Sequence, residues 1–241
     1  IGPGTGALTQ HLVKRAEAVH AVEVDRELLA RLRVDFEDTP NIFLHEGDIL
    51  KTEVGDLVPE GKVLVVGNLP YHITSDLILW LIKHHDRVSR AVILMQKEVA
   101  LRLTAEPGER EAGSLTLALN YRCEAERLLD VPPSCFRPIP KVQSSLVVLR
   151  FRDKPLVEPT DERFFFRVIR GAFGERRKTL ANSLSGALKV PRAIVADSIS
   201  AIGLDERIRG ERLSLEQFCE LANDLVVRMK TNSDQPSDGE A

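Results

Sequence analysis

The chain has 241 residues, of which 43% are hydrophobic and 29% charged, and its formal net charge is −3. These values are typical of a water-soluble globular protein, long enough for one sizeable domain and a small one. The longest apolar runs are far shorter than a membrane span, which argues against a transmembrane helix. Three widely separated cysteines favour reduced thiols in the cytoplasm over a disulfide framework, and the sequence predicts no metal site.

The charges are unevenly distributed along the chain. Between Arg137 and Arg192 there are 13 lysines and arginines but only 5 acidic residues, so this block carries +8 and the remainder −11. A basic block on an acidic chain is typical of a nucleic-acid-binding face. A solvated charged face is the ordinary alternative.

The chain begins with Ile1, directly at a glycine loop that would normally follow a strand, so we expect an N-terminal segment to be missing. Apolar β-branched runs then alternate with helical patterns, which predicts a mainly parallel sheet covered by helices on both faces. The expected strands are 18–24, 41–48, 62–68 and 90–95, and the expected helices are 26–36, 75–85 and 97–106.

The rhythm changes after these elements. Two further strands, 123–131 and 144–152, are joined by a proline-rich loop and could pair as a hairpin at one sheet edge. We expect the domains to be residues 1–152, a linker 153–162, a small all-helical domain 163–229 and a disordered tail 230–241.

The glycine loop and the next two strand ends suit an adenosine-containing cofactor. The stretch "IGPGTGALTQHLVKR" places Gly2, Gly4 and Gly6 before a helix, so bare backbone and a helix N-terminus can meet a ligand. Glu23 closes the next strand and can accept both ribose hydroxyls, whereas Asp48 closes the following one and can accept from an adenine amine. A nicotinamide dinucleotide and S-adenosylmethionine both fit this pattern, and a structural turn with two surface acids is the alternative.

The loop "GNLPYHI", which follows the fourth expected strand, distinguishes the two cofactors. A base amine that accepts a methyl group needs acceptors for its N–H bonds and a ring surface to hold the base flat. Asn68 offers a side-chain oxygen, and Leu69 offers a carbonyl whose direction Pro70 restricts. Tyr71 offers an aromatic face for stacking. The loop therefore favours methyl transfer to a base over hydride transfer.

Other aromatic and basic residues suit contacts with RNA. Phe136, in "CFRPIPKVQSS", is a candidate second stacking surface with Lys141 beside it for a phosphate, although a rigid loop with a core phenylalanine explains both equally well. Phosphate contacts would suit four residues of "RGAFGERRKTLANSL", namely Arg170, Arg176, Arg177 and Lys178. Phenylalanines 164–166 and 173 are expected in the core instead.

The motifs "IGPGTGALT", "VEVDRELLARL", "EGDIL", "GNLPYHI", "CFRPIPKVQSSL" and "FGERRKTLANSL" together resemble the KsgA (RsmA) family of ribosomal RNA adenine N6-dimethyltransferases. The resemblance extends over nearly the whole chain. It implies a class I S-adenosylmethionine-dependent methyltransferase fold, Rossmann-like with a mainly parallel sheet, and a small all-helical C-terminal domain. The implied activity is N6,N6-dimethylation of two adjacent adenosines near the 3′ end of small-subunit (16S) ribosomal RNA, coupled to 30S biogenesis.

The resemblance also implies roles for single residues. Those implied to hold the cofactor are Gly2, Gly4, Glu23, Asp48, Ile49 and Asn68. Those implied to hold the target amine and its base are Asn68, Leu69, Pro70, Tyr71 and Phe136. Three features depart from the family. An upstream "QNFL"-type segment is absent, half of the first strand is missing, and Gln143 stands where an aspartate commonly follows "PKV".

Two other functions remain open. One is the related Erm class, which methylates large-subunit ribosomal RNA and shares the cofactor pocket, although "RRKTLANSL" favours the KsgA type. The other is a binding protein for ribosome assembly in which methylation is dispensable, but intact Glu23, Asp48 and Asn68 argue against a decayed site. The expected partners are small-subunit ribosomal RNA and the 30S precursor particle, and we expect a cytoplasmic monomer.

Overall fold

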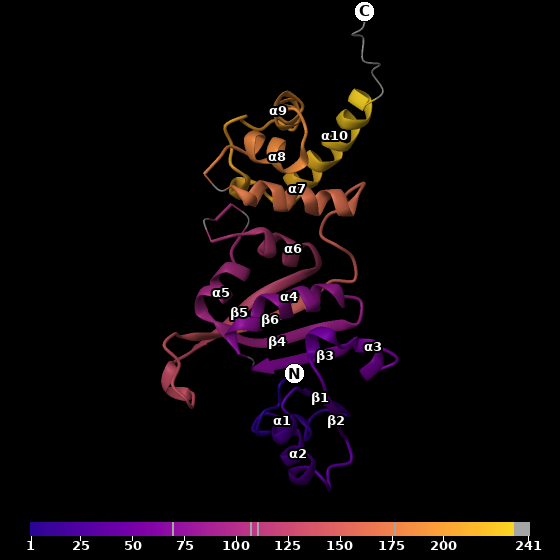
Figure 1. Cartoon of the computed structure of the whole chain (residues 1–241), viewed down its shortest axis with the longest axis vertical. Helices are drawn as coiled ribbons and strands as arrows, with labels where there is room; N and C mark the ends of the chain where they lie inside the picture. Colours follow the sequence, from indigo (N-terminus) through magenta and orange to yellow (C-terminus); the bar gives the residue numbers. More distant parts are fainter. Residues whose placement is uncertain (69, 107, 110, 176, 234–241) are drawn as a thin grey trace, which may run out of the picture. The chain divides into compact units, whose positions relative to one another are not determined.

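The computed structural model describes residues 1–68, 70–106, 108–109, 111–175 and 177–233. The chain divides into two compact units, Ile1–Ala100 with Cys123–Asp153, and Leu101–Arg122 with Lys154–Ala241. All strands of the described residues belong to the first unit, and the second is helical (Figure 1). None of the helices in the described part of the chain is long and apolar enough to cross a bilayer.

The strands of the first unit form two sheets. In the smaller one, β1 (Val19–Glu23) pairs in parallel with β2 (Ile42–Glu46). The larger one has the order β3-β4-β6-β5, and its strands are β3 (Val63–Asn68), β4 (Val88–Gln96), β5 (Cys123–Val131) and β6 (Ser144–Phe151). β3 and β4 are parallel, whereas β6 runs antiparallel to both β4 and β5. The predicted hairpin of the last two strands is confirmed, but the single sheet expected from the alternation is instead two sheets.

Helices connect and cover these strands. α2 (Arg26–Asp35) begins at Asp25, whose carboxylate accepts from the backbone N–H groups of Glu27 and Leu28 and so satisfies the first turn. α4 (Thr74–Lys83) is apolar enough to be buried and covers one face of the larger sheet through Leu77, Ile78 and Leu81 (Figure 1). The remaining elements of this unit are short: α1 (Thr9–Leu12), η1 (Ile49–Lys51), α3 (Val54–Leu57), η2 (Tyr71–Ile73) and η3 (Pro133–Cys135).

The second unit is a helical bundle. Its helices are α6 (Ser114–Arg122), α7 (Glu162–Gly174), α8 (Leu180–Leu188), α9 (Arg192–Ala201) and α10 (Leu215–Ser233), with η4 (Gly210–Arg212) between the last two. α5 (Lys97–Leu103) crosses the unit boundary. Phe164 and Phe165 are buried in the core, and Phe166 and Phe173 pack against it, which confirms the expectation that these rings are structural.

Two boundaries differ from the expected ones. α6 had no predicted element, and it groups with the second unit because Leu117 and Tyr121 are buried in that unit's core. α10 continues to Ser233, so residues 230–233 are helical rather than part of a disordered tail. The rest of the expected tail, 234–241, lies outside the described residues.

Candidate active site

The glycine loop starts between the two sheets of the first unit. Gly2 N donates a hydrogen bond to Val22 O at 3.0 Å, one residue before Glu23. Ile1 N donates to Val66 O at 2.7 Å, two residues before Asn68. The loop therefore starts beside the carboxyl-terminal halves of both β1 and β3, the strands that end in Glu23 and Asn68. Carboxyl ends of strands are where open α/β sheets bind ligands.

The loop needs glycine at Gly4 and Gly6 for different reasons. Both have left-handed backbone conformations, with φ of +58° and +80°. A Cβ on Gly4 would meet no atom within 4 Å, so open space lies above this residue. A Cβ on Gly6 would lie 2.8 Å from the Phe36 ring, so this glycine lets the loop pack on α2. Gly4 thus faces open space, whereas Gly6 faces the core.

The helix expected to follow this loop is present but short. α1 comprises only four residues, Thr9–Leu12, and has no side-chain cap. A helix of one turn has a small dipole, so its N-terminus offers a ligand less charge than a longer helix would. The role of this loop in cofactor binding stays a prediction, and it depends mainly on the glycine backbone.

Glu23 lies at the end of β1 with only 6% of its surface exposed. Its carboxylate accepts three backbone N–H bonds, from Gly4 at 3.1 Å, from Val24 at 3.0 Å and from Asp25 at 3.1 Å. A carboxylate has about four acceptor positions, so one position remains for an outside hydroxyl. The bonds fix the side chain against the loop, which explains how an acid can be buried here at all.

Asp48 and Ile49 follow β2. The Asp48 carboxylate accepts from Leu50 N at 3.0 Å and caps η1, and its second oxygen is 3.8 Å from Lys51 Nζ. Ile49 is buried, with 6% of its surface exposed. The structure thus places an oriented carboxylate beside an apolar side chain, a combination suited to the edge and face of an adenine ring.

The reactive loop follows β3. Asn68 ends the strand, pairs with Leu94 of β4 and is exposed, and no hydrogen bond to its side-chain amide occurs among the described residues. Leu69, the second candidate in this loop, lies outside the described residues. Pro70 is the N-cap of η2 with an extended backbone, φ −55° and ψ 136°.

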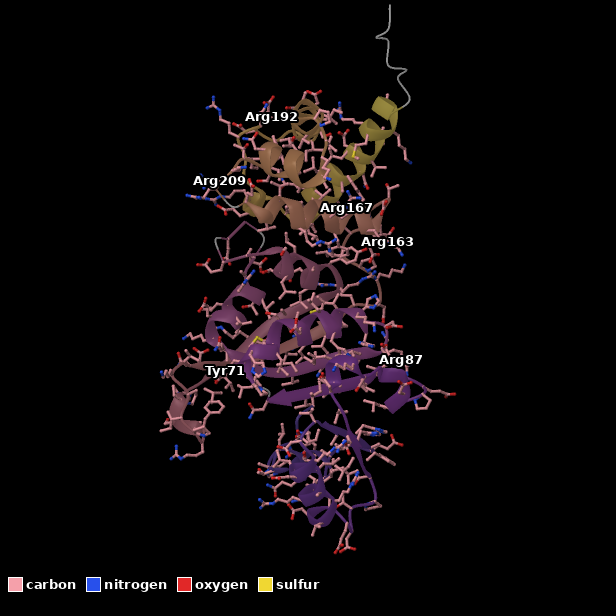
Figure 2. The ribbon with its side chains drawn as sticks, in the orientation of Figure 1. Tyr71, Arg87, Arg163, Arg167, Arg192 and Arg209 are labelled. Atoms are coloured by element: carbon pink, nitrogen blue, oxygen red, sulfur yellow. The ribbon has the colours of Figure 1, made fainter. Side chains whose placement is uncertain are left out.

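Tyr71 lies at the edge of the larger sheet where β3 ends (Figure 2). Its hydroxyl is 2.8 Å from Ser144 Oγ, on the fully buried first residue of β6. The ring itself is half-buried. Sequence reasoning missed Ser144, because 73 residues separate it from its partner and a serine in a strand carries no motif.

Phe136 and Lys141 lie on an arm, residues 132–143, that extends from the ends of β5 and β6 (Figure 1). Phe136 is half-buried at the end of η3, and Lys141 is exposed. The arm belongs to the same unit as Tyr71, and Ser144 immediately follows it. Tyr71 is therefore hydrogen-bonded to the first residue of β6, and Phe136 lies on the arm that precedes this strand.

The base of this arm is held by a polar network that the sequence did not reveal. Lys97 Nζ lies 2.7 Å from Asp130 Oδ2 and donates to Gln143 Oε1 at 3.1 Å. Ser145 Oγ and Arg127 each donate to Asp130 Oδ1 at 2.7 Å. Hydrogen bonds from Lys97, Ser145 and Arg127 hold the pKa of Asp130 well below its usual range. Gln143, the residue that departs from the family pattern, is thus a member of this network.

The expected RNA-binding residues of the C-terminal part lie in the second unit. Arg170 is exposed on α7, and Arg177 and Lys178 are exposed in the turn before α8. Lys178 is ion-paired with Glu175, which reduces the charge it offers to a ligand. Arg176 lies outside the described residues.

The first unit has the features of a class I methyltransferase: a glycine loop, acids closing the next two strands, and an Asn-x-Pro-Tyr loop after β3. The open space above Gly4 has room for a ligand, and the remaining acceptor position on Glu23 can take a ribose hydroxyl. Both features fit S-adenosylmethionine. Within the described residues, no group of three His, Cys, Asp or Glu side chains is arranged to hold a metal ion.

Comparison with known proteins identifies the family within this class of methyltransferases. The family model for ribosomal RNA adenine dimethylases matches residues 1–226, and the chain belongs to that family. It is 42% identical over 235 residues to proteins named ribosomal RNA small subunit methyltransferase A in Bacillus mycoides and Bacillus anthracis, covering 94% of this chain and 80% of theirs. The protein is an S-adenosylmethionine-dependent methyltransferase, as predicted from the sequence.

Solved structures support the same fold. The 23S ribosomal RNA methyltransferase ErmE has a TM-score of 0.72 at 29% identity, covering 93% of this chain and 88% of that one. A dimethyladenosine transferase from Plasmodium falciparum has a TM-score of 0.75 at 24% identity, covering 96% and 89%. The predicted methyltransferase fold with a C-terminal helical part is confirmed.

Proposed function

We propose that this protein dimethylates N6 of two adjacent adenosines near the 3′ end of small-subunit ribosomal RNA. The observation that carries the proposal is the loop that begins at Asn68, at the end of β3 and beside the glycine loop. The Asn68 amide has no hydrogen-bond partner among the described residues, and Tyr71 is half-buried. The identity of 42% to small-subunit enzymes over nearly the whole chain supports this substrate over the large-subunit RNA of ErmE, at 29%.

The cofactor would be held by the glycine loop and the two acids. Gly2 and Gly4 would lie beside its methionine part, Glu23 would accept from a ribose hydroxyl, and Asp48 with Ile49 would contact the adenine. When bound, S-adenosylmethionine supplies an electrophilic methyl group. Because three backbone N–H groups already orient the Glu23 carboxylate, binding costs this side chain little conformational entropy.

Asn68 and Tyr71 would prepare the target base. The Asn68 side-chain oxygen would accept a hydrogen bond from one N–H of the adenine amine. The backbone carbonyl of Leu69 would accept from the other N–H. These bonds reduce delocalisation of the nitrogen lone pair into the ring, and they hold the nitrogen in line with the methyl group. Tyr71 and Phe136 would hold the base flat from its two faces. Each transfer releases one amine proton, which water at the exposed strand end accepts.

The target adenosine must leave its stack to reach this loop. An irregular or single-stranded RNA segment therefore suits the site better than a regular duplex. We assign catalysis to the first unit and RNA contacts, through Lys141 and through Arg170, Arg176, Arg177 and Lys178, to the arm and the helical unit. A 30S precursor particle in the cytoplasm is the proposed substrate, and a monomer is the proposed active form.

The proposal is tested by incubating the protein with labelled S-adenosylmethionine and each isolated ribosomal subunit precursor, followed by mass mapping of the RNA. We expect four methyl groups on two neighbouring adenosines of the small subunit, since each of the two amines takes two methyl groups. Asn68→Ala should abolish the labelling without lowering stability, because the side chain is exposed and has no partner within the described part of the chain.

Two outcomes would contradict the proposal. Labelling of the large subunit alone would assign the chain to the Erm type. Full labelling by Asn68→Ala would remove the assigned mechanism, even if the substrate were correct.

A further inference from the structure

Three arginines form a stripe along α7 that the sequence analysis did not identify as a unit. Arg163, Arg167 and Arg170 are spaced by four and three residues, so they lie on one face of the helix. All three are exposed, whereas Phe164 and Phe165 face the core. The stripe extends about 10 Å along the helix axis. Figure 2 shows Arg163 and Arg167 on this helix.

Within the described part of the chain, these arginines have no carboxylate partner, unlike other arginines of this unit. Arg122 pairs with Glu162 at 3.0 Å and Arg228 with Asp224 at 2.5 Å. No ion pair to the stripe occurs among the described residues, and the contact of Arg167 is with a ring, 5.6 Å from the Phe164 centroid. The stripe therefore presents positive charge that no ion pair within residues 1–68, 70–106, 108–109, 111–175 and 177–233 neutralises.

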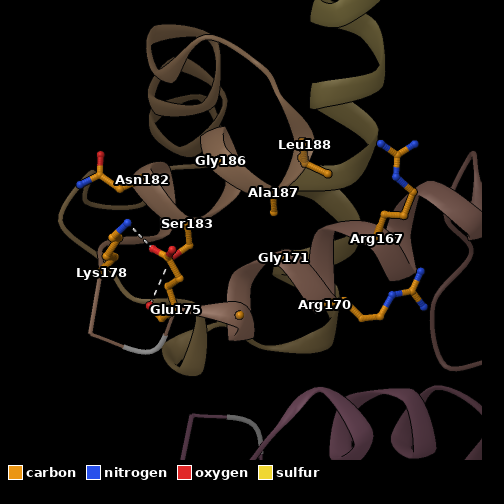
Figure 3. A pocket seen from close by; sticks show the side chains of 11 residues that line it. Arg167, Arg170, Gly171, Glu175, Lys178, Asn182, Ser183, Gly186, Ala187 and Leu188 are labelled. Carbon is orange, nitrogen blue, oxygen red and sulfur yellow. Dashed lines mark hydrogen bonds and ion pairs between the residues drawn. The ribbon is translucent and has the colours of Figure 1, made fainter.

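The stripe borders an open groove of about 530 Å³ between α7 and α8. Arg167 and Arg170 stand at one end, and Lys178 and Asn182 stand at the other (Figure 3). Among the described residues, Glu175 is the one carboxylate that lines the groove, and it is ion-paired with Lys178. The described titratable side chains of the lining thus carry three positive charges and one negative charge.

Glycines shape the groove. A Cβ on Gly171 would lie 2.9 Å from the Ala187 Cβ, so this glycine lets α7 and α8 approach closely. Gly174 and Gly186 also line the groove, and a Cβ on either would meet no atom within 4 Å. Backbone is therefore accessible to a ligand at these two positions, as is common where a chain meets phosphates.

We propose that this groove and the Arg163–Arg167–Arg170 stripe bind consecutive phosphates of an RNA strand. The inference rests on the proposed function, and it adds a defined RNA-binding surface to it. Open, hydrated and cationic surfaces bind phosphodiesters through charge, and guanidinium groups match phosphate geometry.

Gly186 allows a test with matched variants. Gly186→Glu and Gly186→Lys both place a long side chain over the groove, but with opposite charge. Gly186→Ala controls for folding, and Asp197→Lys adds positive charge to α9, outside the groove. Binding of a small-subunit RNA fragment is measured as a function of salt concentration, with thermal unfolding of each variant alongside.

We expect Gly186→Glu to weaken binding about tenfold and Gly186→Lys to leave it equal or tighter, whereas Gly186→Ala changes neither binding nor folding. Asp197→Lys should tighten binding less than Gly186→Lys. Equal effects of the glutamate and lysine variants would overturn the inference, as would equal effects of the two lysine variants.

A second measurement uses the stripe itself. The triple variant Arg163→Gln, Arg167→Gln, Arg170→Gln should lower the salt slope of binding by about three, one for each lost phosphate contact. Arg228→Gln removes a paired arginine and should leave the slope unchanged. If the wild type methylates small-subunit RNA but the triple variant keeps its slope, only the groove inference fails. If the wild type binds through the groove without methylating, only the proposed function fails.

Discussion

The Tyr71 hydroxyl forms a 2.8 Å hydrogen bond with Ser144 Oγ and so joins the reactive loop to the first residue of β6. Ser144 is fully buried, whereas the ring of Tyr71 is half-buried. The hydroxyl end of the tyrosine is therefore tied to the sheet. The arm with Phe136 directly precedes the same strand, so Tyr71 and Phe136 are linked to it in different ways, one through a hydrogen bond and the other through the chain.

This relationship predicts a shared effect of two conservative variants. Tyr71→Phe and Ser144→Ala should each slow methyl transfer about threefold to tenfold, because each removes one hydrogen bond of about 1 kcal/mol. The double variant should be no slower than either single one. Tyr71→Ala should lose more, since stacking contributes about 1–3 kcal/mol. Single-turnover transfer rates measure the effects, and additive losses would show that the bond does not position the ring.

Gly4 and Gly6 should respond differently to alanine. Both substitutions strain a left-handed backbone by about 1–2 kcal/mol. Gly6→Ala also forces a Cβ against Phe36 and should cost roughly 3 kcal/mol in total. Gly4→Ala meets no protein atom, so its main effect should be weaker cofactor binding. Thermal unfolding with and without S-adenosylmethionine separates the loss of stability in Gly6→Ala from the weaker cofactor binding in Gly4→Ala. If Gly4→Ala bound the cofactor as tightly as the wild type, the space above Gly4 would not be part of the cofactor site.

The network around Asp130 predicts a dependence of stability on pH. Its pKa is lowered from the ordinary value of 3.8 by hydrogen bonds, first from Lys97 and then from Ser145 and Arg127. Because the pKa of Asp130 is lower in the folded state than in the unfolded state, the ionised carboxylate stabilises the fold at pH values above the unfolded pKa. This stabilisation is lost as the pH falls from the unfolded pKa toward the folded pKa. Asp130→Asn should therefore destabilise at neutral pH, and its difference from wild type should shrink below about pH 4.

Urea unfolding of both proteins between neutral and acidic pH measures this difference. Asp197→Asn is the control, because Asp197 is exposed on α9 and forms no ion pair among the described residues. If the difference in free energy of unfolding between wild type and Asp130→Asn stayed constant down to about pH 2, the lowered pKa of Asp130 would not contribute to stability as predicted.

The three cysteines should differ in reactivity. Burial raises the pKa of Cys123 to about 12 and also raises that of Cys219, whereas Cys135 is exposed on the arm. Since the thiolate is the reactive form, iodoacetamide should label Cys135 first. Peptide mass mapping over time gives the order, with Cys135→Ser as the control that removes the fast phase. Fast labelling of Cys123 in the folded protein would contradict its burial.

Much of the fold was predictable from the sequence because the signals are local. Runs of β-branched residues and three-to-four-residue apolar spacing gave the strands and most helices, since each pattern reflects which face of one element is buried. α6 was missed because it is buried on several sides, with Thr116, Leu117, Leu119 and Tyr121 all inaccessible, and so lacks an amphipathic pattern. The two-sheet arrangement was missed because strand pairing depends on partners distant in sequence.

The sequence by itself determined which side chains we propose for the chemistry. The glycines, Glu23, Asp48, Asn68 and Tyr71 stand in short motifs whose spacing follows from strand and loop geometry. Only the tertiary structure decided what supports them. Ser144 reaches Tyr71, Lys97 reaches Asp130, and the arginines of α7 border a groove with α8, each across a separation that no local pattern encodes. The physical reason is that such contacts depend on how elements pack, whereas a motif depends only on the conformation of its own backbone.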